Sequence, residues 1–223
     1  MPTTPTSRRR PKQARAEFAL DSILEAAART LESHGKAGLT TQRVADTAGF
    51  SIGAIYQYFP NKDGLVEALA RRELERLTAM MKEALAQPAP FGTGINARKM
   101  IRTTAAFIGD RPRLYGILRA EWSDAAPDTP IGQGMLRYFE MISSTLNREN
   151  PELGKRIAGA EARFVLFRAI SGVLLAAALE RPNYLGTDAF EDEMVRLILG
   201  FLTYDLAPDI PRLAREGDSF TSA

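Results

Sequence analysis

The segment LTTQRVADTAGFSIGAIYQYFPNK, residues 39–62, contains the signals that decide the fold. Thr40 stands at a helix N-cap position, and apolar side chains follow it at helical spacing. Gly49 ends this helix because glycine readily adopts the left-handed conformation that a tight turn requires. Ser51 can cap another helix, which Pro60 stops. The segment therefore predicts two short helices, over 41–48 and 52–59.

Two helices joined by a tight, glycine-containing turn form a helix-turn-helix. The surface left outward comprises Thr41, Gln42, Ser51, Gly53, Ala54, Tyr56, Gln57 and Tyr58. Small residues at the start of the second helix let its backbone approach base edges and phosphates closely, which indicates DNA binding. A generic helical hairpin has the same pattern, and Tyr56 and Tyr58 can alternatively be core aromatics.

Helices are also predicted on both sides of this motif. An apolar stripe with helical spacing predicts a helix over residues 14–33 that Gly35 terminates. His34 lies in its last turn, where a partly protonated imidazole favours the negative end of the helix dipole. After the motif, Asn61 caps a long helix that runs to about Leu85.

The remaining sequence is also helical in pattern. Two prolines and two glycines make residues 87–94 a linker. Five helices are predicted beyond it, over 96–108, 112–122, 134–146, 152–180 and 187–206, with prolines near their boundaries. Residues 207–223 are expected to be a loose tail. The fold class is therefore all-α.

The composition excludes several kinds of chemistry. The chain has 223 residues, no cysteine and one histidine, so disulfides, thiol catalysis and multi-histidine metal sites are not expected. No cofactor or metal is expected either. No apolar run reaches the ~20 residues that span a bilayer, and no export signal follows the basic N-terminus. We expect a cytoplasmic protein that makes no membrane contact and is not an enzyme.

The charge is unevenly distributed along the chain. Residues 1–62 contain nine Lys/Arg and five Asp/Glu, and the remaining residues contain 20 and 22. A basic N-terminal part favours a polyanionic partner. Residues 1–14 are expected to form a flexible basic arm, which either follows DNA or is a solvated tail; its basic residues are Arg8, Arg9, Arg10 and Lys12, with Arg15 next to it.

The segment 39–62, with its pattern LTT…VA…AG.S.G.IY.YF.NK, resembles the DNA-binding signature of the TetR/AcrR family of bacterial transcriptional regulators. The resemblance covers about residues 15–75, and the rest matches only in its general plan. It implies an N-terminal three-helix DNA-binding domain (motif 40–59), joined by a long fourth helix to a helical ligand-binding and dimerisation domain over 76–206. It also implies a homodimer on a near-palindromic operator in double-stranded DNA.

The resemblance also assigns roles to residues at the DNA. Thr40 and Thr41 lie where the second helix meets the backbone; Tyr56, Tyr58 and Lys62 occupy phosphate-contacting positions; Gln42, Ile52, Gly53 and Ala54 lie where bases are reached. The complete expected set adds Arg43, Ser51 and Gln57. Two positions depart from the family pattern. Ala54 replaces a threonine, and Gly64 replaces a glutamate that would complete a capping box.

The C-terminal domain is expected to dimerise and to bind a ligand. Residues 164–178 are apolar on nearly all faces, so their helix must be covered by several neighbours. By the resemblance, the expected dimer interface comprises Gly172, Ala176, Ala177, Leu197, Ile198, Phe201 and Leu202. Methionine and aromatic side chains suit a pliable apolar pocket, and plain core packing is the alternative. The candidates are Met80, Met81, Phe107, Tyr115, Leu118, Trp122, Phe139, Phe164, Phe167 and Arg168.

The expected function is that of a homodimeric repressor released from its operator by a small, largely apolar ligand. Two other functions remain open: a ligand-independent or loosely specific DNA-binding protein, and a helical small-molecule binder or enzyme with a vestigial DNA module. Arg163 and Arg168 interrupt the apolar helix. They either serve the interface or capture an acidic ligand. Whether the protein represses or activates, and which genes it controls, also remains open.

Overall fold

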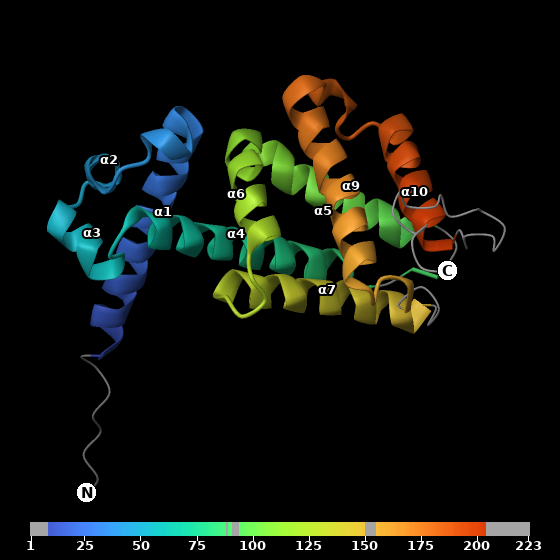
Figure 1. Ribbon diagram of the computed structural model, residues 1–223, viewed down its shortest axis with the longest axis horizontal. Helices are drawn as coiled ribbons and strands as arrows, with labels where there is room; N and C mark the ends of the chain where they lie inside the picture. Colours follow the sequence, from blue (N-terminus) through green and yellow to red (C-terminus); the bar gives the residue numbers. More distant parts are fainter. Residues whose placement is uncertain (1–8, 88, 91–93, 150–154, 204–223) are drawn as a thin grey trace, which may run out of the picture.

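The computed structural model describes residues 9–87, 89–90, 94–149 and 155–203 (Figure 1). Within these residues the secondary structure is helical and contains no strand. The elements are α1 (Arg9–Gly38), α2 (Thr41–Ala48), α3 (Ile52–Tyr58), α4 (Lys62–Ala84), α5 (Ile95–Asp110), α6 (Pro112–Asp124), α7 (Pro130–Glu149), α9 (Ala160–Glu180), the 3-10 helix η1 (Pro182–Tyr184) and α10 (Asp188–Thr203). The all-α fold class is confirmed.

The first three helices pack around a small apolar core. Ile23 of α1, Val44 of α2 and Ile55 of α3 are fully buried together with the first turns of α4. Gly49, with φ of 72°, makes the turn between α2 and α3 in the left-handed conformation. The helix-turn-helix therefore forms with the helix starts and the turn that the sequence predicts.

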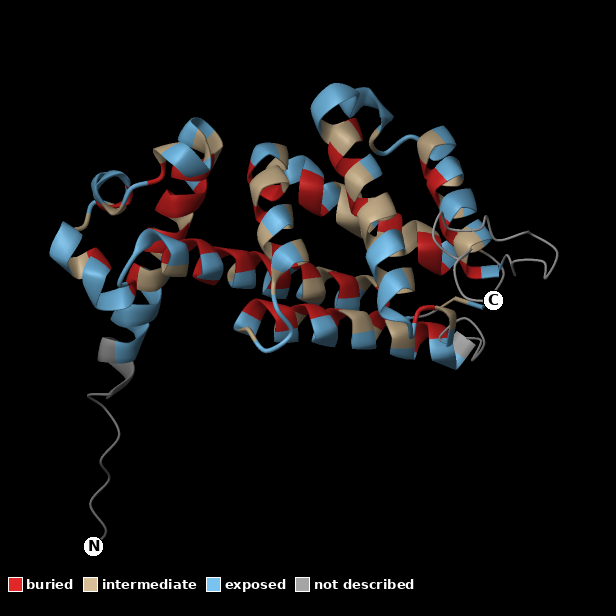
Figure 2. Cartoon of the chain, viewed as in Figure 1, coloured by how far each residue is buried: buried red, intermediate tan, exposed pale blue. Residues whose placement is uncertain are grey.

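Helix α4 connects the two halves of the molecule. It leaves α3, runs beneath the C-terminal helices and lies alongside α7 (Figure 1). Its buried face forms a nearly continuous strip (Figure 2). Because one helix contributes to both cores, a shift of α4 in one half must be felt in the other.

The C-terminal half is a helical assembly above α4 and α7. Helix α5 packs against α9 and α10, and α6 packs against α7 and α9. Asn96, at the start of α5, exchanges two hydrogen bonds with the backbone of Ala89 at 3.0 and 2.9 Å, which anchors the described part of the linker.

Two features differ from the sequence-based expectation. Helix α1 begins at Arg9, so residues 9–13 of the expected arm are helical. The helix expected over 152–180 is interrupted, because Ile157–Gly159 form a turn and α9 starts only at Ala160. The turn buries Ile157, and Gly159 takes an extended conformation there. Residues 1–8, 204–206 and the expected tail at 207–223 lie outside the described residues.

Helix α9 has an unusual surface. Among the described residues it is the one helix long and apolar enough, by length and composition alone, to cross a membrane. Arg163 and Arg168 interrupt its apolar residues, so this helix contains no uninterrupted apolar run of that length. In the structure 22% of the apolar window is buried, so much of this helix faces away from the protomer's own core.

Candidate DNA-binding surface and ligand cavity

The outer faces of α2 and α3 form one exposed surface. Tyr56 is 51% exposed and Tyr58 is 36% exposed, which removes the alternative that they are core aromatics. Of the residues expected at DNA, Thr41 and Ala54 are half-buried. The others are exposed: Thr40, Gln42, Arg43, Ser51, Ile52, Gly53, Tyr56, Gln57, Tyr58 and Lys62. The structure thus brings the whole expected set to one end of the molecule.

Hydrogen bonds fix the geometry of this surface. The Thr40 hydroxyl accepts from the Arg43 N–H at 3.1 Å, and the Ser51 hydroxyl accepts from the Ala54 N–H at 3.2 Å. Each of these side chains therefore satisfies a free N–H at the start of its helix. The hydroxyls of Tyr56 and Thr41 lie 3.2 Å apart and join α3 to α2.

Two side chains on α2 already have partners within the protein. Gln42 donates to the Asp46 carboxylate at 2.8 Å, and Arg43 donates to the carbonyl oxygen of Gly38. The bond to Asp46 uses one N–H of the Gln42 amide, and its second N–H and its oxygen remain available to a base.

Lys62 begins α4 at the edge of the same surface. Asn61 accepts from the Gly64 N–H at 2.8 Å, so the helix is capped even without a glutamate at position 64. An exposed lysine at a helix N-terminus combines its own charge with the partial positive charge of the free N–H groups, and this combination favours a phosphate.

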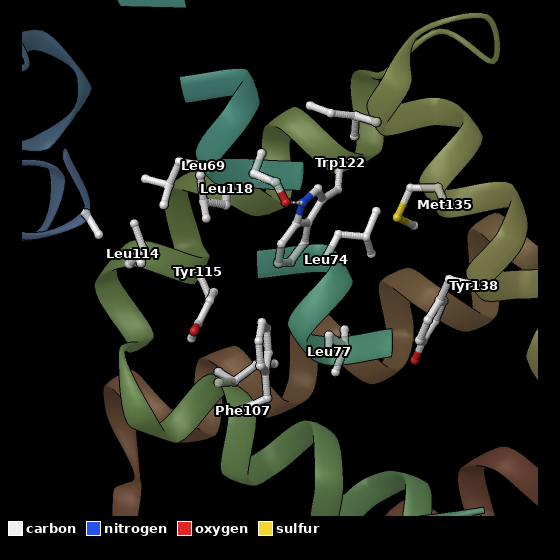
Figure 3. Close-up of a cluster of buried hydrophobic side chains, with 14 of the residues drawn as sticks. Leu69, Leu74, Leu77, Phe107, Leu114, Tyr115, Leu118, Trp122, Met135 and Tyr138 are labelled. Carbon is white, nitrogen blue, oxygen red and sulfur yellow. Dashed lines mark hydrogen bonds between the residues drawn. The ribbon is translucent and has the colours of Figure 1, made fainter. Parts of the chain in front are cut away.

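An apolar cavity lies inside the C-terminal half, between α5, α6, α7, α9 and α10. Aromatic rings form much of its wall: Phe107 stacks on Tyr115 with centroids 4.1 Å apart, and Phe139 meets Phe167 edge-on at 5.7 Å. Figure 3 shows Phe107, Tyr115 and Trp122 facing one another across the cluster. Such a set of rings suits an apolar or aromatic ligand.

The structure places five of the ten candidate ligand residues on this cavity: Phe107, Tyr115, Trp122, Phe139 and Phe167. Met81 and Leu118 are fully buried in the core, and Met80 is half-buried away from the cavity. Helix α4 contributes Leu77 to the wall instead. Phe164 and Arg168 line an adjacent groove, not the cavity itself.

Sequence patterns missed several lining residues, namely Arg119, Tyr138 and Ser171. Arg163, which was considered for an acidic ligand, also lines the cavity. Tyr138 is buried, and this burial raises the pKa of its hydroxyl. Helical spacing puts Arg119 on the same face of α6 as Tyr115 and Trp122, so this spacing was the available signal for that residue.

Helix α6 connects the cavity wall to α4. Trp122 donates from its indole Nε1 to the Ala70 carbonyl oxygen at 2.9 Å (Figure 3), and the Tyr115 hydroxyl donates to the buried Glu73 at 3.0 Å. Burial and the nearby Glu73 charge raise the pKa of Tyr115, so it stays a neutral donor at physiological pH.

Helix α6 is also tied to α1. Arg111, which precedes α6, donates to Glu32 and Glu25 of α1 at 3.0 Å each. These carboxylates raise the pKa of Arg111, chiefly through the hydrogen bond with Glu32. At the other end of α6, Glu121 accepts from Lys36 of α1. One short helix thus lines the cavity and holds the first helix of the DNA-binding half.

The exposed face of α9 differs in part from the expected dimer interface. Ala177, Ile198 and Leu202 are buried within the protomer, so their assignment to a surface was wrong for the free protomer. Ile198 lines the cavity, and Ile198 and Leu202 line a second apolar pocket. Gly172, Ala176 and Phe201 are half-buried, and Leu197 is exposed. The apolar side chains that do face outward are Phe164, Val165, Val173, Leu179 and Leu197, which we call the α9 face.

Comparison with known proteins agrees with this geometry. The family described as "Bacterial regulatory proteins, tetR family" matches residues 23–69, from α1 into α4. The HTH-type transcriptional repressor AcnR of Corynebacterium diphtheriae is 36% identical over 97 residues, 38% of this chain and 51% of AcnR. The HTH-type transcriptional regulator BetI of Paraburkholderia phytofirmans is 28% identical over 176 residues, 76% of this chain and 86% of BetI.

Solved structures share the fold at low identity. The fatty acid degradation regulator FadR from Bacillus halodurans has a TM-score of 0.65 at 18% identity, over 83% of this chain and 97% of that chain. A TetR family transcription regulator from Marinobacter aquaeolei also has a TM-score of 0.65, at 17% identity, over 85% and 98% of the two chains. The match over residues 23–69 makes this part of the chain a TetR-type helix-turn-helix DNA-binding domain of a transcriptional regulator, and the chain spans about half the length of AcnR.

Proposed function

We propose that the protein is a homodimeric, cytoplasmic repressor that binds a near-palindromic operator and is released by a small, largely apolar ligand. In this proposal residues 15–75 bind DNA, and residues 76–206 bind the ligand and the second protomer. The main support for this proposal is that α6 lines the apolar cavity and also contacts both α1 and α4. The name of AcnR, a repressor, supports repression over activation.

Helix α3 is the proposed recognition helix. Gly53 has only the Ser51 hydroxyl within 4 Å of an added Cβ, so its backbone is open to the surroundings. A bare backbone at the helix start lets the helix enter the major groove deeply. Tyr56, Tyr58 and Lys62 then hold phosphates beside it, which fixes the register of the helix on the DNA.

Dimerisation is proposed through the α9 face. Phe164 is 57% exposed and Leu179 is 52% exposed, and both lie on one helix with Val165 and Val173. An exposed apolar surface of this kind marks an interaction site. A second copy is the proposed partner, because two-fold symmetry presents the same apolar face from each side and positions two α3 helices for two half-sites.

The ligand acts through α6 in this proposal. A molecule that displaces Trp122 or Tyr115 pulls on Ala70 and Glu73 of α4 through the hydrogen bonds described above. The same displacement moves α6 relative to α1 and therefore stretches the ion pairs of Arg111 with Glu25 and Glu32. A 100-fold loss of operator affinity needs ~2.7 kcal/mol of coupling, an ordinary allosteric magnitude, and operator must weaken the ligand equally.

The test is selection of DNA fragments from a random pool, followed by titration of the selected site. A palindrome whose half-sites lie ~34–36 Å apart is expected. Binding that depends steeply on salt but selects no sequence would instead identify a loosely specific DNA-binding protein. A thermal-shift screen with apolar and aromatic compounds then tests the ligand. Stabilising compounds that leave operator affinity unchanged would contradict the ligand-released part of the proposal.

A further inference from the structure

Two groups of arginines in this protein differ in their partners. In the first group every guanidinium lies against carboxylates. Arg111 pairs with Glu25 and Glu32, and Arg72 pairs with Glu73 at 2.7 Å. The other members of this group are Arg76, which pairs with Glu73 and Asp110, and Arg98 and Arg102, which pair with Glu191 and its neighbours.

The second group lines the cavity and the adjacent groove. Its members are Arg119, Arg163 and Arg168, and neither lining contains an aspartate or a glutamate among the described residues. Arg119 lies against Gly172, where an added Cβ would be 3.5 Å from its Nη1. Arg163 is held by the carbonyl oxygens of Ile157 and Ala158, which are neutral acceptors.

Arg168 is the least satisfied member of this group. Its Nε is buried without any hydrogen-bond partner in the described part of the chain. Its nearest carboxylate, Asp124, is 3.9 Å away and 79% exposed, too distant and too hydrated to satisfy the guanidinium. The guanidinium instead lies over the Phe164 ring at 5.3 Å.

Cations in an apolar wall lose hydration and are stabilised by an anion that returns hydrogen bonds and charge. Each arginine of the first group has a carboxylate partner. In the second group, among the described residues, the one carboxylate nearby is Asp124, which lies 3.9 Å from Arg168 and is 79% exposed. A planar guanidinium fork also matches a carboxylate in a bidentate arrangement. We propose that the ligand is an amphipathic carboxylate, with its head in the groove at Arg163 and Arg168 and an apolar body in the cavity.

The walls favour an elongated body. Trp122, Phe139, Arg163 and Phe167 are shared between the groove and the cavity. Met100, Ile142, Leu166, Ile170 and Ile198 are shared between the cavity and a further apolar pocket beneath α9 and α10. The three hollows therefore adjoin one another through shared wall residues. A flexible chain that moves these side chains can extend from the arginines into the apolar end. This inference depends on the proposed function only for the effect of the ligand on DNA.

The test compares compounds with one chain length and different headgroups: dodecanoate, dodecan-1-ol, dodecyltrimethylammonium and dodecyl phosphate, each below its micelle-forming concentration. Trp122 is the only tryptophan of the chain and lies in the cavity wall, so its fluorescence reports binding directly. Dodecanoate is expected to bind ~10- to 100-fold more tightly than dodecan-1-ol, as for hydrogen bonds to charged groups.

Substitutions then locate the headgroup. Arg163→Gln and Arg168→Gln are each expected to weaken dodecanoate ~10-fold while leaving dodecan-1-ol unchanged. Arg113→Gln is the control, because Arg113 is an exposed arginine that lines none of the three hollows. Circular dichroism on each variant establishes that the fold is retained.

Each outcome of the headgroup comparison either supports or overturns the proposed carboxylate site. Equal binding of dodecanoate and dodecan-1-ol, tightest binding of the ammonium compound, or no binding of any compound overturns it. Tighter binding of dodecyl phosphate overturns the carboxylate assignment in favour of a phosphate ester. Selective dodecanoate binding that leaves operator affinity unchanged supports the anion site and contradicts the proposed release from DNA, so the two proposals fail separately.

Discussion

The indole Nε1 of Trp122 donates a hydrogen bond to the carbonyl oxygen of Ala70 at 2.9 Å, which joins α6 to α4. Trp122 also lines the cavity, and the helix that contains Ala70 begins at Lys62 beside the proposed recognition helix. The cavity wall and the DNA-binding surface are therefore separated by one hydrogen bond and one continuous helix.

Trp122→Phe tests this connection. The variant loses the hydrogen bond and part of the buried ring, so the free energy of unfolding is expected to fall by about 1–3 kcal/mol. A dissociation assay with any compound found to release the operator is expected to give a smaller change in operator affinity than in the unmodified protein. An unchanged ratio of affinities would show that the Trp122–Ala70 bond does not transmit the signal.

Lys62→Ala tests the phosphate contact. The substitution is expected to weaken binding to all DNA sequences similarly and to reduce the slope of log affinity against log salt by about one. Lys82→Ala, at the exposed far end of α4, is the control and is expected to change neither quantity. A Lys62→Ala variant with the original salt slope would remove Lys62 from the interface.

Gly49 and Gly53 form a matched pair for separating folding from recognition. Gly49 has a positive φ of 72°, so Gly49→Ala is expected to destabilise the protein by about 1 kcal/mol in urea unfolding, although nothing crowds an added Cβ. Gly53 is helical and open, so Gly53→Ala is expected to leave stability unchanged or raised while altering the selected operator sequence. The reverse pattern would mean that the turn, and not α3, reads the DNA.

Val173→Glu tests the α9 face. An unpaired charge on the proposed interface is expected to raise the dimer dissociation constant about 100-fold, measured by sedimentation, and to weaken operator binding with it. Phe18→Glu places the same charge on another exposed apolar residue, on α1, and should leave the dimer intact. Ala177→Glu, in contrast, buries the charge inside the protomer and is expected to unfold it.

Acid should weaken the contact between α5 and α10. Hydrogen bonds from Arg102 and then Arg98 lower the pKa of the buried Glu191 despite its desolvation. A carboxylate whose pKa is lower in the folded state stabilises the protein above the unfolded pKa, and this stabilisation is lost as the pH falls through the folded pKa. Glu191→Gln is therefore expected to unfold more easily than the parent at pH 7. The difference in unfolding free energy should shrink below about pH 4, and a constant difference would contradict this assignment.

Local signals explain why the DNA-binding half could be predicted closely. Thr40, Ser51 and Asn61 each accept an N–H three residues further along the chain, so each helix start depends on a few neighbouring residues. Gly49 fixes the turn in the same local way. The helix starts and the turn could therefore be predicted without knowing how the rest of the chain packs.

Long-range packing decided the features that the sequence could not predict. Helix α9 is apolar on nearly all sides, so its pattern does not say which face meets the protomer's core, and Ala177 was assigned to the wrong side. Burial of Ile157 accompanies the break before α9, and only Gly159 marked that break in the sequence.

The salt bridges between α6 and α1 limit how this protein can be recombined with its relatives. An engineered chimera that joins a foreign recognition module to this sensor would replace Glu25, Glu32 and Lys36, and would leave Arg111 and Glu121 without their partners. Working hybrids must therefore carry these three α1 residues across the junction, even though none of them lines the cavity and none is among the residues proposed to contact DNA.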